Sequence, residues 1–350
     1  MTRFFQKLLL ALSVALMLAL DAHASLTTLN QLFVFGDSLS DGGNYSGPGA
    51  FPPYPFADTR YSNGPTAVEY LWQAYHSGDT TFKPSNFGGT NYALGGATSG
   101  SLNYNANALN PSVPDALKTF FADQGGVASQ VSKFTTDFRG SIVPDESLFV
   151  IWAFPNDVFS NALLGAAGLS PKELITTGVT NIVGAVQQLS GKGATNFLIP
   201  NMPDLGKTPA FSGDPSLSAN VSGLTVAFNT ALAGALTALD QGMNEVSITQ
   251  FDTFGALNAI IADKELFGFT NVTQQCVANL QNGRCNDPNT WLFWDGVHPT
   301  TAGHTILGAQ FAAAIPEPDS LWLVALALML LTVRGQLHRR RWAQRGINTR

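Results

Sequence analysis

Residues 32–44 read Leu-Phe-Val-Phe-Gly-Asp-Ser-Leu-Ser-Asp-Gly-Gly-Asn. The first four are apolar and favour β-structure, and a polar, glycine-rich turn follows them directly. This pattern predicts a buried strand that delivers Ser38 to the end of a sheet. A hydroxyl placed there suits a nucleophile, but a serine after a strand is more often a helix cap, and Ser38 and Ser40 both fit that role. A catalytic interpretation needs a base, an orienting acid and oxyanion donors from elsewhere in the chain.

The N-terminal residues 1–24 have the parts of a secretory signal peptide. Arg3 and Lys7 supply the charge, an apolar run covers 8–20, and small residues end the segment. We therefore expect the mature chain to begin at Ser25. A membrane-anchoring helix is the less favoured alternative, because the run is shorter than the ~20 residues that span a bilayer.

The C-terminal residues 315–350 hold a Pro-Glu-Pro motif at 316–318, an apolar run over 321–333 and an arginine-rich tail. They resemble the PEP-CTERM sorting signal of Gram-negative bacteria. The resemblance implies export, processing by an exosortase-type machinery, and a final place in the cell envelope, on the outer surface or outside the cell. A simple tail anchor with its basic cluster on the cytoplasmic side is the alternative. We expect membrane association only through this segment.

The body between these ends, residues 25–314, shows no internal repeat and no linker, so we expect one domain. Up to residue 315 it carries 10 Lys and Arg against 21 Asp and Glu, which gives a net charge of −11. Binding to phosphate needs clustered Lys and Arg. The acidic balance therefore argues against nucleic acid as a partner.

Cys276 and Cys285 are the two cysteines of the chain, and they lie close together in a polar segment. In an oxidising compartment this spacing favours a local disulfide. A metal site is disfavoured, since no histidine lies nearby in the sequence to complete it.

Segments with strand patterns alternate with helical ones along the body. Strands are expected at 32–35, 88–98, 147–152, 195–200 and 245–251, and helices near 67–72, 129–138, 177–189 and 224–239. Such alternation indicates a parallel sheet with helices on both faces. Ligands of these sheets bind beyond the carboxyl ends of the strands, which would bring Ser38, Gly95, Gly96 and Asn156 to one edge. We expect the aromatic loop 45–56 to form a rim there, lining an acyl pocket or packing itself down.

The segment 291–304 supplies the base. His298 follows Asp295 by three residues in a turn rich in glycine and proline, just before a predicted helix. At that spacing the carboxylate can orient the imidazole without help from elsewhere. A lone histidine is usually a satisfied polar group, but an Asp-x-x-His-Pro turn in a chain with a serine at a strand end is far more specific.

Together these residues resemble the GDSL family of the SGNH hydrolases over about 32–311. The matching blocks, in order, are Gly36-Asp37-Ser38-Leu39-Ser40-Asp41, Asn91-Tyr92-Ala93-Leu94-Gly95-Gly96-Ala97, Asn156-Asp157, Asn201-Met202-Pro203-Asp204-Leu205-Gly206 and Asp295-Gly296-Val297-His298-Pro299. The resemblance implies a flavodoxin-like three-layer α/β/α sandwich with a five-stranded parallel sheet. One position departs from the pattern: Phe154 stands two residues before Asn156, where the family usually has glycine.

The resemblance also implies the roles of the site residues. Ser38 would be the nucleophile, His298 the base, and Asp295 the group that orients it. The backbone N–H of Ser38, a backbone N–H of Gly96 (Gly95 as the alternative) and the side-chain amide of Asn156 would form the oxyanion hole. Asp37 and Asp157 would be structural, holding their turns through backbone hydrogen bonds.

The sequence thus predicts an exported carboxylic-ester hydrolase of the lipase or esterase type that acts through an acyl-enzyme and needs no metal or cofactor. Its substrate would be a lipid, a small ester or an acylated polysaccharide, the last because such sorting signals resemble those that accompany exopolysaccharide production. A non-catalytic carbohydrate-binding module on the same fold is the alternative from another functional class.

Overall fold

The computed structural model describes residues 26–47, 49–279 and 283–315. The expected signal peptide and nearly all of the expected sorting segment lie outside these residues. At the centre is a parallel sheet in the order β1-β2-β3-β4. Its strands are β1 (Gln31–Gly36), β2 (Ser147–Trp152), β3 (Asn196–Pro200) and β4 (Ser247–Phe251).

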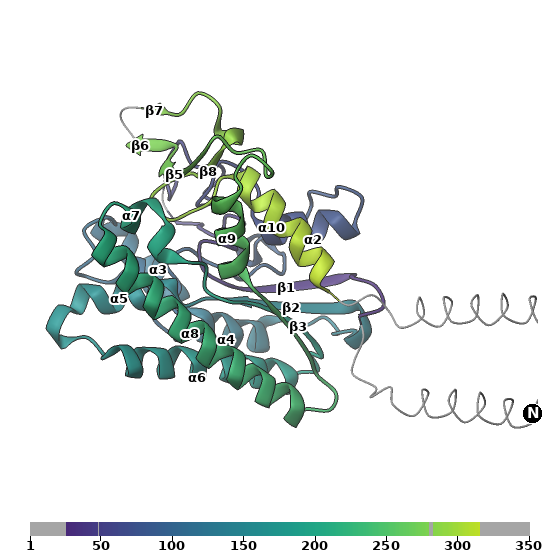
Figure 1. The fold of residues 1–350 in the computed structure, drawn as a ribbon. Coiled ribbons are helices and arrows are strands. Elements are labelled where there is room, and N and C mark those ends of the chain that lie inside the picture. The colour runs from purple at the N-terminus through teal and green to yellow at the C-terminus, as the bar shows by residue number, and fades with distance from the viewer. Residues whose placement is uncertain (1–25, 48, 280–282, 316–350) are drawn as a thin grey trace, which may run out of the picture.

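Helices cover both faces of the sheet, as Figure 1 shows. The helices are α2 (Ala67–Tyr75), α3 (Asp115–Gln124), α4 (Val127–Asp137), α5 (Pro155–Leu164), α6 (Pro171–Ser190), α7 (Pro209–Ser212), α8 (Pro215–Gly242), α9 (Thr253–Ala262) and α10 (Thr301–Ala314). Two small sheets pair β5 (Asn271–Gln275) with β8 (Trp291–Phe293), and β6 (Val277–Asn279) with β7 (Gly283–Arg284).

The alternation of side chains along β1 explains the three layers. Leu32 and Val34 belong to a buried cluster with α2 and α10, whereas Phe33 and Phe35 belong to the cluster with α4, α6 and α8. Successive side chains of a strand point to opposite faces, so a continuous apolar strand must be covered on both sides. The two clusters on opposite faces of the sheet confirm the predicted three-layer α/β/α sandwich.

The prediction of five strands is wrong for the segment 88–98, because the described main sheet has four. Residues 90–94 do lie along β1, with N–H to C=O bonds from Val34 to Thr90, from Tyr92 to Val34 and from Leu94 to Gly36. On the outer side, however, the Asn44 side chain donates to the carbonyls of Asn91 and Ala93 at 2.7 and 2.8 Å. Backbone bonds from Ser85 to Asn91 and from Asn91 to Lys83 also hold this side, and the segment forms only isolated bridges, from Asn91 to Val34 and to Pro84.

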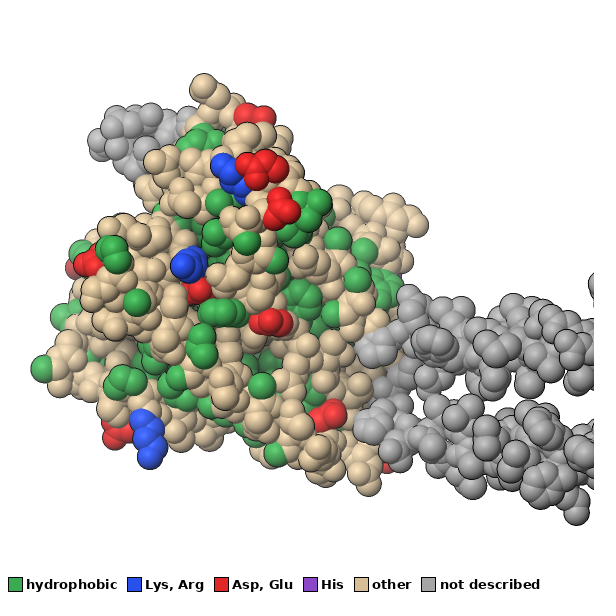
Figure 2. Space-filling view, in the orientation of Figure 1, with side chains coloured by type: hydrophobic (Ala, Val, Ile, Leu, Met, Phe, Trp, Pro, Cys, Tyr) green, Lys and Arg blue, Asp and Glu red, His purple; other side chains and the backbone are tan. Residues whose placement is uncertain are grey.

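The helix α8 is long and apolar enough by composition to cross a membrane, alone among the described residues. It lies along α6, and Val221, Phe228, Leu232 and Leu236 on one side of it are buried in the large apolar cluster. A helix that packs one apolar side against the core of a protein shows the same pattern of burial. On the face drawn in Figure 2, the Lys and Arg side chains are few and separate, in keeping with the acidic composition.

The aromatic loop 45–56 is mostly packed down on α3. The Tyr45 ring lies 4.8 Å from that of Phe120, and the Phe51 ring lies 5.3 Å from that of Phe121. Tyr54 is the exception, with 78% of its surface exposed. The loop was expected either to line an acyl pocket or to pack itself down, and Tyr45 and Phe51 do the second.

Candidate active site

Ser38 lies two residues beyond β1, at the carboxyl end of the sheet. A Cβ on Gly36 would lie 2.5 Å from the carbonyl oxygen of Trp152, so only glycine lets the two strands come this close. The Gln130 side chain accepts from the Gly36 N–H and donates to the Gly36 carbonyl. These contacts fix the end of the strand, and with it the position of Ser38.

The structure brings Ser38, His298 and Asp295 into one chain of hydrogen bonds. His298 Nε2 lies 2.7 Å from Ser38 Oγ, and His298 Nδ1 lies 2.7 Å from Asp295 Oδ2. Asp295 Oδ1 accepts from the backbone N–H groups of Val297 and His298 at 2.9 and 2.8 Å. The carboxylate thus closes its own turn while it holds the imidazole, as the three-residue spacing predicts. The Ser38 hydroxyl faces the imidazole and caps no helix.

Electrostatics within this chain favour a protonated imidazole beside a charged carboxylate. Burial lowers the pKa of His298, but the charge and hydrogen bond of Asp295 outweigh it, and the net pKa is raised above 6.5. Burial raises the pKa of Asp295, yet His298 and the two backbone donors bring the net pKa below 3.8. Each group stabilises the ionised form of the other.

Asp37 and Asp157 hold backbone beside the site. Asp37 Oδ1 accepts from Leu39 N–H at 3.0 Å, and Asp157 accepts from both the backbone and the hydroxyl of Ser99. Burial is the main cause that raises the pKa of Asp37 to about 7 and that of Asp157 to about 6. The Asp157 contacts join α5 to the segment that follows the paired glycines.

The paired glycines form a tight turn next to the end of β1. The Ala97 N–H donates to the Leu94 carbonyl at 3.1 Å, and Gly96 has a φ of +82° whereas Gly95 does not have a positive φ. These are the marks of a type II turn. The Gly95 N–H is occupied, because it donates to Asp41 Oδ2 at 2.8 Å. In the described residues no acceptor is recorded for the N–H of Gly96 or of Ser38.

Asn156 lies at the start of α5 and faces the same turn, with its Nδ2 3.2 Å from the Ala97 carbonyl oxygen. The unusual Phe154 before it has a φ of +117°, in the region that favours glycine. Its ring is buried and stacks on that of Phe228, with centroids 3.6 Å apart. The glycine-like backbone is therefore kept, and packing holds the strained residue in place.

Sequence reasoning missed Tyr61, Asn103 and Asn105, which also surround the site. The Tyr61 ring lies 5.2 Å from that of His298, and its hydroxyl accepts from Asn105 Nδ2 at 2.9 Å. They come from loops without periodicity, where an isolated Tyr or Asn gives no local signal. His304 has a structural role, since its Nδ1 accepts from the Ala67 N–H and burial lowers its pKa to about 3.

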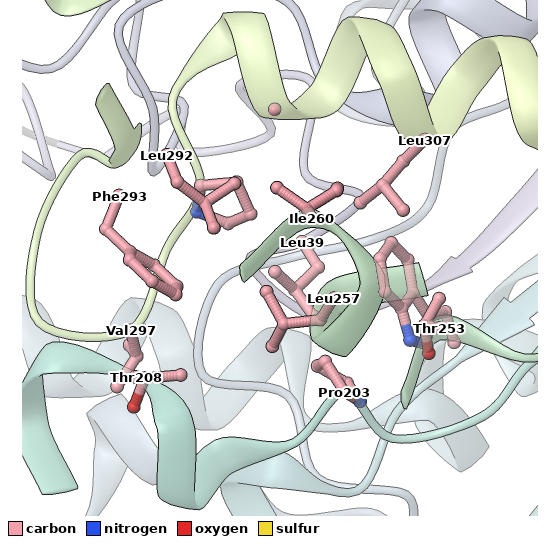
Figure 3. Close-up of a pocket in the computed structure, with 13 residues that line it drawn as sticks. Leu39, Pro203, Thr208, Thr253, Leu257, Ile260, Leu292, Phe293, Val297 and Leu307 are labelled. Atoms are coloured by element: carbon pink, nitrogen blue, oxygen red, sulfur yellow. The ribbon is translucent and has the colours of Figure 1, made fainter. Parts of the chain in front are cut away.

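A small apolar pocket, with a volume of about 30 Å³, lies beneath the catalytic turns, between α9 and α10 (Figure 3). Leu39 and Val297, the neighbours of Ser38 and His298, both line it. Leu257, Ile260 and Leu307 point into it from the two helices. A pocket with this lining accepts hydrocarbon and offers few partners to a polar group.

Cys276 and Cys285 form a disulfide, as their spacing predicts. The segment they close is tied to the strand before Asp295, because the N–H groups of Cys276 and Val277 donate to the carbonyls of Phe293 and Trp294. Within the described residues, no group of three or more His, Cys, Asp or Glu side chains is arranged to hold a metal ion.

The family model of the GDSL-like lipases and acylhydrolases matches residues 32–311. The chain belongs to this family. This acylhydrolase is 23% identical over 313 residues to a GDSL esterase/lipase of Arabidopsis thaliana, covering 79% of the chain and 86% of the relative. It is 24% identical over 330 residues to acetylajmalan esterase 2 of Rauvolfia serpentina, covering 79% and 87%. It spans only 51% of the length of an uncharacterised Pseudomonas putida protein, to which it is 25% identical over 322 residues and 87% of the chain.

Solved structures resemble the acylhydrolase more distantly. An acetylxylan esterase from Geobacillus stearothermophilus has a TM-score of 0.41 at 16% identity, covering 83% of the chain and 97% of that structure. A phospholipase A1 from Streptomyces albidoflavus has a TM-score of 0.42 at 12% identity, covering 83% and 100%. At these scores the likeness decides nothing about substrate. Family membership and the esterase relatives make the protein a carboxylic-ester hydrolase.

Proposed function

We propose that the protein hydrolyses carboxylic esters through an acyl-enzyme formed on Ser38. The observation that carries this proposal is the unbroken chain of hydrogen bonds from Ser38 through His298 to Asp295, with 2.7 Å at each link to the imidazole. A serine hydroxyl is a weak nucleophile until an adjacent base takes its proton. The imidazole is placed to do so, and the charged Asp295 favours the imidazolium that results.

The reaction proceeds in two halves. Ser38 Oγ attacks the carbonyl carbon while His298 Nε2 takes its proton, and the carbonyl oxygen becomes an oxyanion. When the intermediate collapses, the bond to the alcohol breaks and His298 returns the proton to the leaving oxygen. Water then attacks the acyl-enzyme, with His298 as base, and releases the acid and free Ser38.

The oxyanion is stabilised by the backbone N–H of Ser38, the backbone N–H of Gly96 and the Nδ2 of Asn156. Gly96 is favoured over Gly95 because the Gly95 N–H is bound to Asp41, while Gly96 has no recorded acceptor in the described residues. Asn156 Nδ2 lies beside the same turn, at Ala97. Loss of one such donor usually costs ~3 kcal/mol of barrier, about a hundredfold or more in rate.

The acyl group of the substrate would lie in the apolar pocket next to Leu39 and Val297. Its apolar lining supports a substrate with a hydrocarbon acyl group, and its volume of about 30 Å³ suits a short chain, as in a small aliphatic ester. Each buried methylene contributes roughly 0.8 kcal/mol to such binding.

We also propose that the protein works outside the cytoplasm. The two terminal segments suit export and sorting, and the Cys276–Cys285 disulfide suits an oxidising compartment. Fractionation of the producing cells, with an antibody to the body of the protein, tests this directly. Recovery of the full-length chain in the cytoplasm would contradict it.

The test of the catalytic proposal uses two matched serine variants. Ser38→Ala should abolish hydrolysis of p-nitrophenyl butyrate and covalent labelling by a fluorophosphonate. Ser40→Ala removes a hydroxyl two residues away that is buried and makes no hydrogen bond, so it should keep both. Failure of the folded wild-type protein to label would instead favour a non-catalytic carbohydrate-binding module. Activity in Ser38→Ala would remove Ser38 from its role.

A further inference from the structure

The turn at residues 94–97 has a central peptide whose orientation decides where the Gly96 N–H points. Type I and type II turns differ mainly by a flip of this peptide, which exchanges the sides of its C=O and N–H. Glycine at both Gly95 and Gly96 leaves the chain free to adopt either form. The flipped form would aim a carbonyl where the other aims a donor. Something outside the turn must therefore select the orientation.

Two buried asparagines hold the Gly95 carbonyl. Asn103 Nδ2 and Asn105 Nδ2 each donate to this oxygen at 3.1 Å. Both asparagines are buried, with only 5% and 6% of their surface exposed. On the other side of the same residue, the Gly95 N–H donates to Asp41 Oδ2. Both polar groups of Gly95 are thus occupied.

The planar trans peptide carries this constraint to Gly96. Because the N–H of Gly96 and the C=O of Gly95 share one plane and point in opposite directions, fixing the carbonyl toward the asparagines fixes the N–H away from them. Two donors on the carbonyl also polarise the peptide, which strengthens its N–H as a donor. A flip would leave the carbonyl without its donors and would cost each of the two buried amides one of its acceptors.

We infer that Asn103 and Asn105 are positioning residues of the oxyanion hole, which lock the Gly95–Gly96 peptide with its N–H toward the developing oxyanion. The inference rests on the proposed function, because it assigns a purpose to the Gly96 N–H that only acyl transfer requires. It adds two residues that touch neither the nucleophile nor the base.

The two asparagines are themselves held in place. Asn103 Oδ1 accepts from the Asn105 N–H at 2.8 Å, and Asn103 Nδ2 also reaches the Gly125 carbonyl. Asn105 Nδ2 also donates to the Tyr61 hydroxyl, and the Tyr61 ring lies beside His298. A Cβ on Gly96 would lie 2.4 Å from Asn103 Oδ1, so the fit between turn and asparagines is close.

The experiment replaces each asparagine by aspartate, which keeps the shape and removes the donor. In Asn103→Asp and Asn105→Asp a carboxylate oxygen would face the Gly95 carbonyl and repel it. Asn110→Asp is the matched control, since Asn110 is also buried, donates from Nδ2 to the Tyr104 carbonyl and accepts at Oδ1 from Ser112, but does not touch the glycines. The kinetics of each variant are measured in the full-length protein, and a thermal melting curve of each variant checks that it is folded.

We expect kcat to fall about tenfold in each aspartate variant and about a hundredfold in the double variant, the upper value being the loss of one whole oxyanion donor. KM for p-nitrophenyl butyrate should stay within about twofold, because the ground-state carbonyl needs the donor far less than the transition state does. The affinity of an alkyl boronic acid, which adds to Ser38 as a tetrahedral adduct, should fall by the same factor as kcat. Asn110→Asp should change neither quantity.

Unchanged kcat in folded Asn103→Asp and Asn105→Asp overturns the inference, and so does an equal loss in Asn110→Asp. A loss of kcat without a parallel loss of boronate affinity also overturns it, since a merely structural defect would not track the tetrahedral adduct. If an aspartate variant does not fold, Asn105→Ala removes the donor without adding a charge and is judged by the same two quantities. Should wild type show no turnover that depends on Ser38, the proposed function fails first, and the inference falls with it.

Discussion

At most positions an alanine variant is more stable than a glycine variant, but at position 154 we expect the glycine variant to be the more stable one. A non-glycine residue at φ +117° costs on the order of 1–3 kcal/mol, while loss of a buried phenylalanine side chain costs about 3–5 kcal/mol. Phe154→Gly loses the ring but relieves the strain, so we expect a net loss of about 2 kcal/mol in the free energy of unfolding. Phe154→Ala keeps the strain and should lose about 3–5 kcal/mol.

The matched control is Phe228, the stacking partner of Phe154. It is equally buried but lies within a helix, where alanine is better than glycine by about 1 kcal/mol. Urea unfolding followed by fluorescence gives the four values. We expect Gly above Ala in stability at 154 and Ala above Gly at 228. If Phe154→Ala is as stable as Phe154→Gly, the backbone strain and its compensation by packing are not as described.

Two further predictions concern the chemistry and the pocket. Since His298 must be neutral to act as base and Asp295 raises its pKa above 6.5, kcat/KM should be lost as the pH falls through a value above 6.5. In Asp295→Asn only the more distant charge of Asp37 opposes the effect of burial on His298, so its pKa should fall and a pH–rate profile should show this limb at lower pH. We expect kcat to fall on the order of 10⁴-fold. A limb that does not move would exclude the coupling. Leu257→Trp should fill part of the pocket, leaving kcat/KM for p-nitrophenyl acetate within about twofold but cutting that for the butyrate at least about tenfold, because roughly two methylenes lose their burial at ~0.8 kcal/mol each. Equal effects on both esters would show that the acyl chain lies elsewhere.

The residues predicted from the sequence share one property: the pattern that points to each of them lies in the residues next to it in the chain. Ser38 follows a buried strand, Asn156 follows another, and Asp295 binds the backbone of the turn that contains His298. Such short-range patterns fix both the element and the direction in which its polar residue leaves it. Together with the resemblance to the GDSL family, which implies the roles of Ser38, His298 and Asp295, these patterns let the sequence place the three residues in one site.

The features that were missed depend on contacts between distant loops. Asn103 and Asn105 are recognisable only once their segment has folded against Gly95, and Tyr61 only once its loop reaches His298. The false fifth strand has the same origin. Its composition favours β-structure, but its pairing with β1 is limited to an isolated bridge, while Asn44, from more than forty residues earlier, and the backbone of residues 83–85 hold its other side.

The packing around Phe154 also limits the order in which mutations can accumulate. A Cβ on Gly178 would lie 2.3 Å from the Phe154 ring, so any larger residue at 178 collides with it. With glycine at 154, a side chain at 178 would meet only the Phe228 ring, 3.3 Å from the added Cβ. A path that introduces the phenylalanine first meets a steric barrier, whereas one that first reduces 178 to glycine does not. Residues 154 and 178 are thus sterically coupled, and a large side chain at both positions is incompatible with this packing.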